Sequence, residues 1–196
     1  MLLPLSNSLS PLGRSRAVVA SGITLGWGTA SNISSIGDSI VATSGTLVEA
    51  RNLGAAVNET VNGVAFTGQS TRDGLDTAFA STGLYVDGGI SASFESIMDS
   101  FAYRAATGNA TLTLTGLTSG QTYQLQLFVS DDRTTSSANL RQQRYTLDSY
   151  VSAFVTNGTS YALACAFIAG GSTQSVTVGW TAGNVVLNAF QVRQIS

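Results

Sequence analysis

Histidine and lysine are both missing from this 196-residue sequence, and all nine basic residues are arginine. Without histidine the chain cannot form a Ser-His-Asp triad, an HExxH zinc site or any imidazole acid or base. Without lysine it has no P-loop, no Schiff-base amine and no Lys-Asn isopeptide crosslink. We therefore expect no enzyme active site and no cofactor, and we expect any assembly of the protein to be non-covalent.

Charge is scarce as well. Charged residues make up 10% of the chain and the formal net charge is -2, whereas roughly 25% of an ordinary globular domain is charged. No basic run is present, which argues against nucleic acid and against an anionic membrane surface as partners. No apolar stretch reaches the roughly 18 residues that a membrane-spanning helix needs, so we expect no membrane insertion.

Cysteine and proline are almost absent. Cys165 is the single cysteine, so an intrachain disulfide is impossible. It lies in the apolar run Tyr161–Phe167, which predicts a buried and chemically inert thiol. The two prolines, Pro4 and Pro11, both fall in the first 21 residues, which differ from the rest in their scattered leucines. We expect this stretch, residues 1–21, to be an extension outside the folded domain.

Short β-rich runs separated by turn residues fill the chain from about residue 22. This pattern, together with 21 glycines and little helical periodicity, predicts an all-β antiparallel sandwich of jelly-roll type over residues 22–196. Asn62-Gly63 indicates a tight turn or bulge. The expected strands are Ile23–Trp27, Gly45–Arg51, Thr60–Thr67, Ala110–Thr115, Thr122–Val129, Gln143–Leu147, Tyr161–Ile168, Gln174–Trp180 and Val185–Arg193.

Three local patterns give more specific expectations. The alternating runs Ala110–Thr115 and Thr122–Val129 flank the turn Thr118–Gly120 and predict a β-hairpin. The segment Phe94–Tyr103 predicts a helical turn that leads into a strand. The region from residue 73 to residue 89 is rich in Gly and Asp and predicts a long irregular loop.

Three stretches resemble a known class of domain. Thr60–Phe66, Leu117–Asp131 and Val186–Val192 are similar to an early strand, a central hairpin and a closing strand of the malectin-like and galactose-binding-like jelly-roll domains of secreted bacterial proteins. The resemblance covers roughly residues 45–195. It implies an antiparallel jelly roll, an extracellular location and, in many members, carbohydrate binding. No binding residue carries over, because the aromatic sugar platforms of those domains have no clear counterpart in this sequence.

The densest charge cluster follows the expected central strand. We expect Asp131, Asp132, Arg133, Arg141 and Arg144 to form an ion-pair network at the rim of the sandwich. A calcium site using Asp131 or Asp132 is an alternative, although nearby arginines oppose a cation. A paired-carboxylate glycosidase is a weaker alternative, because the acidic residues show no supporting pattern.

Two functions fit these observations. The first is a structural subunit of an extracellular or cell-surface filament, whose partners are copies of itself and whose N-terminal segment docks onto the next subunit by β-strand addition. The expected docking residues are Leu2, Leu3, Leu5, Leu9, Leu12, Val18 and Val19. The alternative is a carbohydrate-binding accessory module, with Tyr85 and Tyr150 as the candidate glycan contacts.

Overall fold

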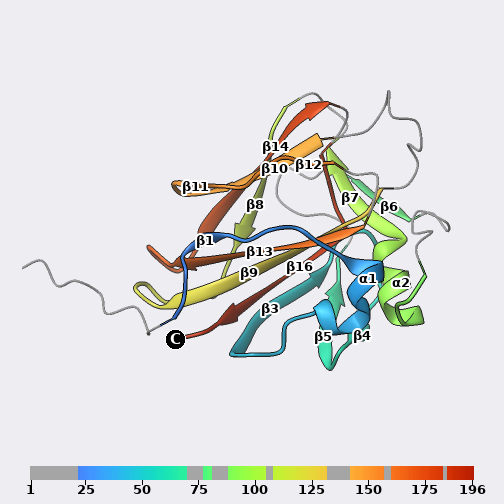
Figure 1. Cartoon of the computed structure of the whole chain (residues 1–196), viewed down its shortest axis with the longest axis horizontal. Coiled ribbons are helices and arrows are strands. Elements are labelled where there is room, and N and C mark those ends of the chain that lie inside the picture. Colours follow the sequence, from blue (N-terminus) through green and yellow to red (C-terminus); the bar gives the residue numbers. More distant parts are fainter. Residues whose placement is uncertain are drawn as a thin grey trace, which may run out of the picture.

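A computed structural model describes residues 22–69, 77–80, 88–104, 108–131, 142–156, 160–182 and 185–196, with only the backbone of 77–80 and 180–182. These residues form an all-β sandwich (Figure 1), which confirms the predicted fold class. The eight-stranded sheet runs β1 (Gly26–Trp27), β13 (Tyr161–Ile168), β9 (Thr122–Val129), β16 (Ala189–Gln194), β3 (Thr46–Asn52), β5 (Val64–Gly68) and β4 (Glu59–Val61), with β2 (Ser31–Asn32) also on β13.

Two smaller sheets and two short helices complete the described fold. The five-stranded sheet runs β11 (Tyr150–Val151), β10 (Gln142–Leu147), β14 (Gln174–Ala182) and β8 (Ala110–Leu114), with β12 (Val155–Thr156) on β10. The three-stranded sheet runs β15 (Val185–Leu187), β7 (Ser100–Arg104) and β6 (Thr77–Ala80). The helices are α1 (Ile33–Ile36), followed by the 3-10 turn η1 (Gly37–Ile40), and α2 (Ala92–Met98).

The main core lies between the eight-stranded and five-stranded sheets, and it corrects the predicted hairpin. Leu125 and Leu127 of β9 and Leu112 and Leu114 of β8 are all buried in this core. However, β9 pairs with β13 and β16, whereas β8 pairs with β14 in the other sheet. The two strands meet face to face through their apolar sides instead of edge to edge. Strict alternation specifies the buried face of a strand but not its pairing partner.

A second core covers the other face of the eight-stranded sheet. The ring of Phe128 in β9 makes edge-on contacts with Phe66 of β5 at 5.8 Å and with Phe94 of α2 at 5.6 Å, measured between ring centroids. Figure 1 shows α1 and α2 together at this end of the sandwich, beside β4 and β5 and far from β11. Both faces of β9 are therefore buried at this end, one in the main core and the other in this second core beside the helices.

The expected helix-to-strand segment is confirmed. The Ser91 side chain accepts a hydrogen bond from the Phe94 amide and caps the start of α2, and β7 begins two residues after the helix ends. Part of the expected loop between residues 73 and 89 is instead a strand, because Thr77–Ala80 pairs with β7. The Asn62-Gly63 turn between β4 and β5 is confirmed, with φ of 48° and 76°.

Besides Thr60–Thr67, which the Asn62-Gly63 turn divides into β4 and β5, two more of the expected strands are shorter or divided. Only Gly26–Trp27 of the predicted Ile23–Trp27 strand is β-structure, where it pairs with Ala166 and Cys165. The predicted strand Val185–Arg193 is broken at Asn188 into β15, which pairs with β7, and β16, which pairs with β3 and β9. The chain thus passes from one sheet to another at a single buried asparagine.

Polar side chains of β9 and β16 form hydrogen bonds with the segment 40–45 and hold it against the eight-stranded sheet. The guanidinium of Arg193 donates hydrogen bonds to the carbonyl oxygens of Thr43, Ser44 and Gly45, each at 2.8 Å. Gln126 bonds the same segment through the backbone of residues 40 and 42. Burial lowers the pKa of Arg193. These buried side chains serve the fold, because backbone groups satisfy them.

Candidate functional site

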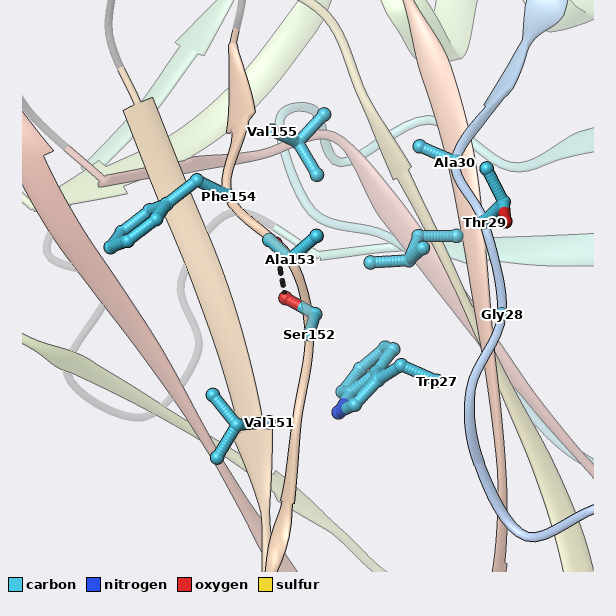
Figure 2. Close-up of a pocket in the computed structure, with 10 residues that line it drawn as sticks. Trp27, Gly28, Thr29, Ala30, Val151, Ser152, Ala153, Phe154 and Val155 are labelled. Atoms are coloured by element: carbon cyan, nitrogen blue, oxygen red, sulfur yellow. Dashed lines mark hydrogen bonds between the residues drawn. The ribbon is translucent and has the colours of Figure 1, made fainter.

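An apolar groove lies where the edges of the two large sheets meet (Figure 2). One wall is the segment Trp27–Ala30, which contains the end of β1. The other wall is the segment Val151–Val155, which joins β11 to β12, and Leu163 of β13 also lines the groove. Its volume is about 380 Å³. The walls come from parts of the chain more than 120 residues apart, as the hydrogen bond between Trp27 and Tyr150 illustrates.

Trp27 is fixed on the first wall by a hydrogen bond and a ring contact. Its indole N–H donates to the carbonyl oxygen of Tyr150 at 3.1 Å, and its ring lies 5.6 Å from the ring of Tyr145 in the main core. The preceding Gly26 has a φ of 114° and its Cα faces the Tyr150 ring closely enough that a Cβ would lie 3.4 Å away. A side chain at position 26 would be strained by this backbone conformation, so glycine helps to position Trp27.

The second wall is tied to β10 through Ser152. Its backbone N–H donates to the carbonyl oxygen of Tyr145 at 2.9 Å, and its hydroxyl accepts from the Tyr145 N–H and donates to the carbonyl oxygen of Ala153. Figure 2 shows the Phe154 side chain turned away from Trp27. Phe154 and Val151 are 47% and 54% exposed, respectively. The wall is therefore ordered by hydrogen bonds while it presents apolar side chains to solvent.

Both walls are sheet edges. Within the described ranges, β1 ends the strand order of the eight-stranded sheet, and β11 and β12 lie on the side of β10 opposite β14. A strand at the edge of a sheet presents backbone N–H and C=O groups that can pair with another chain. The groove thus offers two backbone edges together with apolar side chains between them.

The described lining of the groove is almost entirely apolar. Its described lining contains no acidic, basic or amide side chain, and the Ser152 hydroxyl is already bonded to the backbone. Thr29 supplies the other hydroxyl in the lining. This arrangement suits an extended apolar peptide better than a reacting polar substrate.

A buried polar network lies in the core behind the groove. The Gln143 side chain donates to the hydroxyl of Tyr145 at 2.5 Å and to the carbonyl oxygen of Val186 at 2.9 Å, and the hydroxyls of Tyr145 and Tyr161 are 3.0 Å apart. Burial raises the pKa of both tyrosines well above the usual value. The phenols therefore stay neutral at ordinary pH and act as hydrogen-bond groups within the fold.

Most of the residues expected to be functional lie outside the described residues. These are Leu2, Leu3, Leu5, Leu9, Leu12, Val18, Val19, Tyr85, Asp132, Arg133 and Arg141. Of the others, Asp131 is fully buried. The Arg144 guanidinium lies over the Phe154 ring, 4.9 Å from its centroid. Tyr150 is half-buried behind the groove and bonds Trp27 through its carbonyl. The rim network, the calcium site and the glycan contacts stay predictions.

The groove residues were not recognised from the sequence. The segment Val151–Val155 has no strict alternation, and its two short strands are recognisable only through their pairing with β10. The one available signal was the pair of large apolar residues Val151 and Phe154 in a stretch flanked by turn residues. Exposed apolar side chains that gather in one place commonly mark interaction sites.

Cys165 is expected to resist thiol reagents in the folded protein. Its side chain is fully buried in the main core, and burial raises the pKa of its thiol from 9.0 to about 12. Because this rise is about three pH units, the thiolate fraction at neutral pH is about a thousandfold lower than that of an unburied thiol, and the thiolate is the reactive form. Ellman's reagent should label the protein rapidly in denaturant and very slowly without it. Equal labelling rates in the two conditions would contradict this expectation.

Comparison with known proteins supports the fold. No model of a known protein family and no curated protein matches this chain. Several solved structures, however, are similar to this chain. The ANX2 ectodomain from Arabidopsis thaliana matches with a TM-score of 0.59 and 12% identity over 76% of this chain and 50% of that chain. The ANXUR1 extracellular domain from Arabidopsis thaliana matches with a TM-score of 0.59 and 12% identity over 76% and 48% of the two chains.

An enzyme also contains a similar domain. Bacteroides uniformis beta-glucuronidase 2 matches with a TM-score of 0.54 and 11% identity, over 76% of this chain and 18% of the enzyme. This chain therefore spans about half of the ectodomains and less than a fifth of the enzyme. The ANX ectodomains are malectin-like, so the resemblance seen in the sequence is supported at the level of the fold. Membership of a secreted bacterial family stays a prediction.

No group of three or more acidic, cysteine or histidine side chains within the described ranges is placed to hold a metal ion. Among the helices in the part of the chain that the structure describes, none has the length and apolar character needed to cross a bilayer.

Proposed function

We propose that this protein is a non-catalytic structural subunit of an extracellular filament, in which the N-terminal segment of one copy docks into the groove of the next by β-strand addition. The observation that carries the proposal is the meeting of two sheet edges around an apolar, uncharged groove. Strand addition needs both features, because backbone hydrogen bonds supply affinity and side-chain pockets supply specificity.

The occupant proposed for the groove is the stretch Ala17–Ala20 of a second copy. Its sequence, Ala-Val-Val-Ala, has no charge and is rich in β-branched residues, which favour strands. The groove walls are four and five residues long, so a strand of about this length fits between them. In an extended strand Val18 and Val19 point to opposite sides, so one of them enters the groove. The earlier leucines are less suited, because Pro4 and Pro11 each remove a backbone donor.

Docking of this kind produces a fibre. The docking segment precedes Gly22, whereas the groove lies between residues 27–30 and 151–155, so donor and acceptor are different surfaces of one chain. Such head-to-tail contacts propagate without closing unless the rotation between copies forms a ring. The low charge of the chain also limits electrostatic repulsion between neighbouring copies.

Assembly can be tested with the full chain, a chain lacking residues 1–20, and the Ala153→Arg variant. The arginine places bulk and charge on a groove wall, so we expect both altered proteins to remain monomeric while the full chain forms concentration-dependent oligomers. Sedimentation velocity and negative-stain microscopy measure the outcome. Ala92→Arg, at an exposed position of α2, is the matched control and should assemble like the unaltered chain.

A synthetic peptide of residues 12–21 identifies the docking segment directly. It should bind the chain that lacks residues 1–20 but not the same chain carrying Ala153→Arg. The proposal is wrong if the shortened chain still assembles, or if the full chain stays monomeric over the whole micromolar range. A full chain that stays monomeric but protects its groove from the peptide would show that the segment docks within its own chain.

A further inference from the structure

Four side chains form a patch on the outer face of the five-stranded sheet, beside the groove. Neighbouring residues of a strand point to opposite faces, and Tyr145 of β10 is buried in the main core. Arg144 and Thr146 therefore point outward, and Val151 of β11 joins them because it is the register partner of Thr146. Phe154 completes this outer patch, since its ring centroid lies 4.9 Å from the Arg144 guanidinium. Arg144, Val151 and Phe154 are all exposed.

The Arg144 guanidinium lies over an aromatic ring, and the described residues leave its N–H donors unused. Within the described ranges Arg144 forms no ion pair and its side chain donates no hydrogen bond. The carboxylate of Asp148, in the turn after β10, accepts instead from Gln174 at 2.6 Å. The planar donors of a guanidinium match the two oxygens of a carboxylate, and interfaces between proteins are enriched in arginine and aromatic side chains. The outer patch thus fits a partner that presents a carboxylate beside an apolar side chain.

A surface of this kind lies on α1, η1 and α2, at the end of the sandwich far from β11 (Figure 1). Glu95 of α2 is exposed, and it forms no ion pair within the described ranges. Asp38 of η1 lies beside the start of α2, because its Oδ1 accepts from the Ser91 N–H at 2.9 Å. Ile36, two residues before Asp38, is 46% exposed. Every charged residue of α1, η1 and α2 is acidic. We call Ile36, Asp38 and Glu95 the helix end.

We propose that the outer patch of one copy binds the helix end of another copy, and that this contact joins filaments side by side. Arg144 donates to the carboxylate of Glu95 in the second copy, and Phe154 packs against the Ile36 of that copy. The two surfaces have opposite charge, whereas two outer patches or two helix ends repel each other. A strand docked in the groove leaves Phe154 available, because its side chain is turned away from Trp27 (Figure 2). The joining of filaments rests on the proposed function, but the contact itself does not.

Each contact is weak, and repetition makes it effective. An exposed ion pair contributes about 0.2–1 kcal/mol, so two free copies do not stay together through this contact alone. It therefore leaves the oligomers that strand addition forms unchanged. A filament repeats both surfaces in every subunit, so many contacts act together when two filaments lie side by side. Salt weakens these contacts, because the Debye length falls from about 30 Å at 0.01 M to about 3 Å at 1 M.

Beads coated with the full chain, attached through its N-terminus, test this contact without filaments. A dense coat repeats the two surfaces, and an excess of the peptide of residues 12–21 keeps the grooves occupied. The beads should cluster at about 0.01 M salt and disperse at about 1 M, as measured by turbidity. Arg144→Glu beads and Glu95→Arg beads should each lose clustering, because their two surfaces then have the same charge. A mixture of the two kinds of bead should cluster again, because each kind meets the opposite charge on the other.

Thr111→Glu is the matched control, because it adds a carboxylate at an exposed position of β8 in the same sheet. Its beads should cluster like the unaltered ones. The proposal is overturned if unaltered beads stay dispersed at low salt, if either variant alone clusters normally, or if the mixture stays dispersed. Equal clustering of unaltered beads with plain carboxylate beads would also overturn it, because charge alone would then explain the result. A failure of strand addition changes none of these outcomes, so the two proposals are tested separately.

Discussion

Replacing Asn188 by leucine is expected to lower the free energy of unfolding by about 3–5 kcal/mol. The Asn188 side chain is fully buried. Its Oδ1 accepts from the Ser130 N–H at 2.7 Å, and its Nδ2 donates to the carbonyl oxygens of Met98 and Ser100 at 2.8 and 2.9 Å. Leucine has a similar volume but removes all three of these hydrogen bonds from a buried site, and a buried polar group that loses its partner costs about 1–3 kcal/mol.

Urea denaturation followed by tryptophan fluorescence measures this loss. The matched control is Asn58→Ala, because the Asn58 side chain also accepts from a backbone N–H, that of Gly68 at 2.9 Å, but in an exposed setting. We expect the control to lose about 1 kcal/mol or less. A loss below about 1 kcal/mol for Asn188→Leu would contradict the role of Asn188 as the junction between β9, α2 and β7.

The folded protein is expected to lose stability steeply above about pH 10. Burial raises the pKa of Tyr145 and of Tyr161 above their ordinary value of 10.0. Below that pH both phenols are neutral in the folded and unfolded chains, so their stabilising contribution is fully present. Above it the unfolded chain releases protons that the folded chain keeps, which costs about 1.4 kcal/mol per pH unit for each group until the folded pKa is reached.

Cys165 adds to this alkaline loss from a lower pH. Burial raises its pKa from 9.0 to about 12, so its contribution begins to fall above pH 9 by the same linkage. Together, two phenols and one thiol predict a slope of about 4 kcal/mol per pH unit just above pH 10. Urea midpoints determined at a series of alkaline pH values measure this slope.

Two variants separate the contributions of these groups. Tyr145→Phe removes one titrating group, so the slope should fall by about 1.4 kcal/mol per pH unit, although the protein loses stability at neutral pH because the Gln143 side chain loses a partner. Cys165→Ala should remove the part of the loss that begins at pH 9. A slope that neither substitution changes would show that other groups govern the alkaline transition.

The strands with strict alternation were predictable, and their partners were not. The runs that form β8, β9 and β14 were located from sequence because apolar residues alternate with polar ones, and β13 was located as a continuous apolar run. Their pairing was misjudged for β8 and β9, since both present equivalent apolar faces and only contacts with β14, β13 and β16 distinguish an edge-to-edge from a face-to-face arrangement. Likewise, nothing local in Val185–Arg193 marks Asn188 as a break.

The candidate sites were less predictable than the strands. The groove exists because the ends of β1 and of β11 and β12 approach each other across the edge of the sandwich, and neither segment has a distinctive motif.

The sequence by itself determined which chemistry is absent and where most strands lie. Both follow from the residues alone, since a missing histidine or lysine cannot be restored by folding and a period of two specifies a strand and its buried face. Tertiary structure alone decided which strands pair and which of the described strands lie at the edge of a sheet. These features depend on contacts between residues far apart in the chain, and many apolar strands of similar pattern compete for each contact.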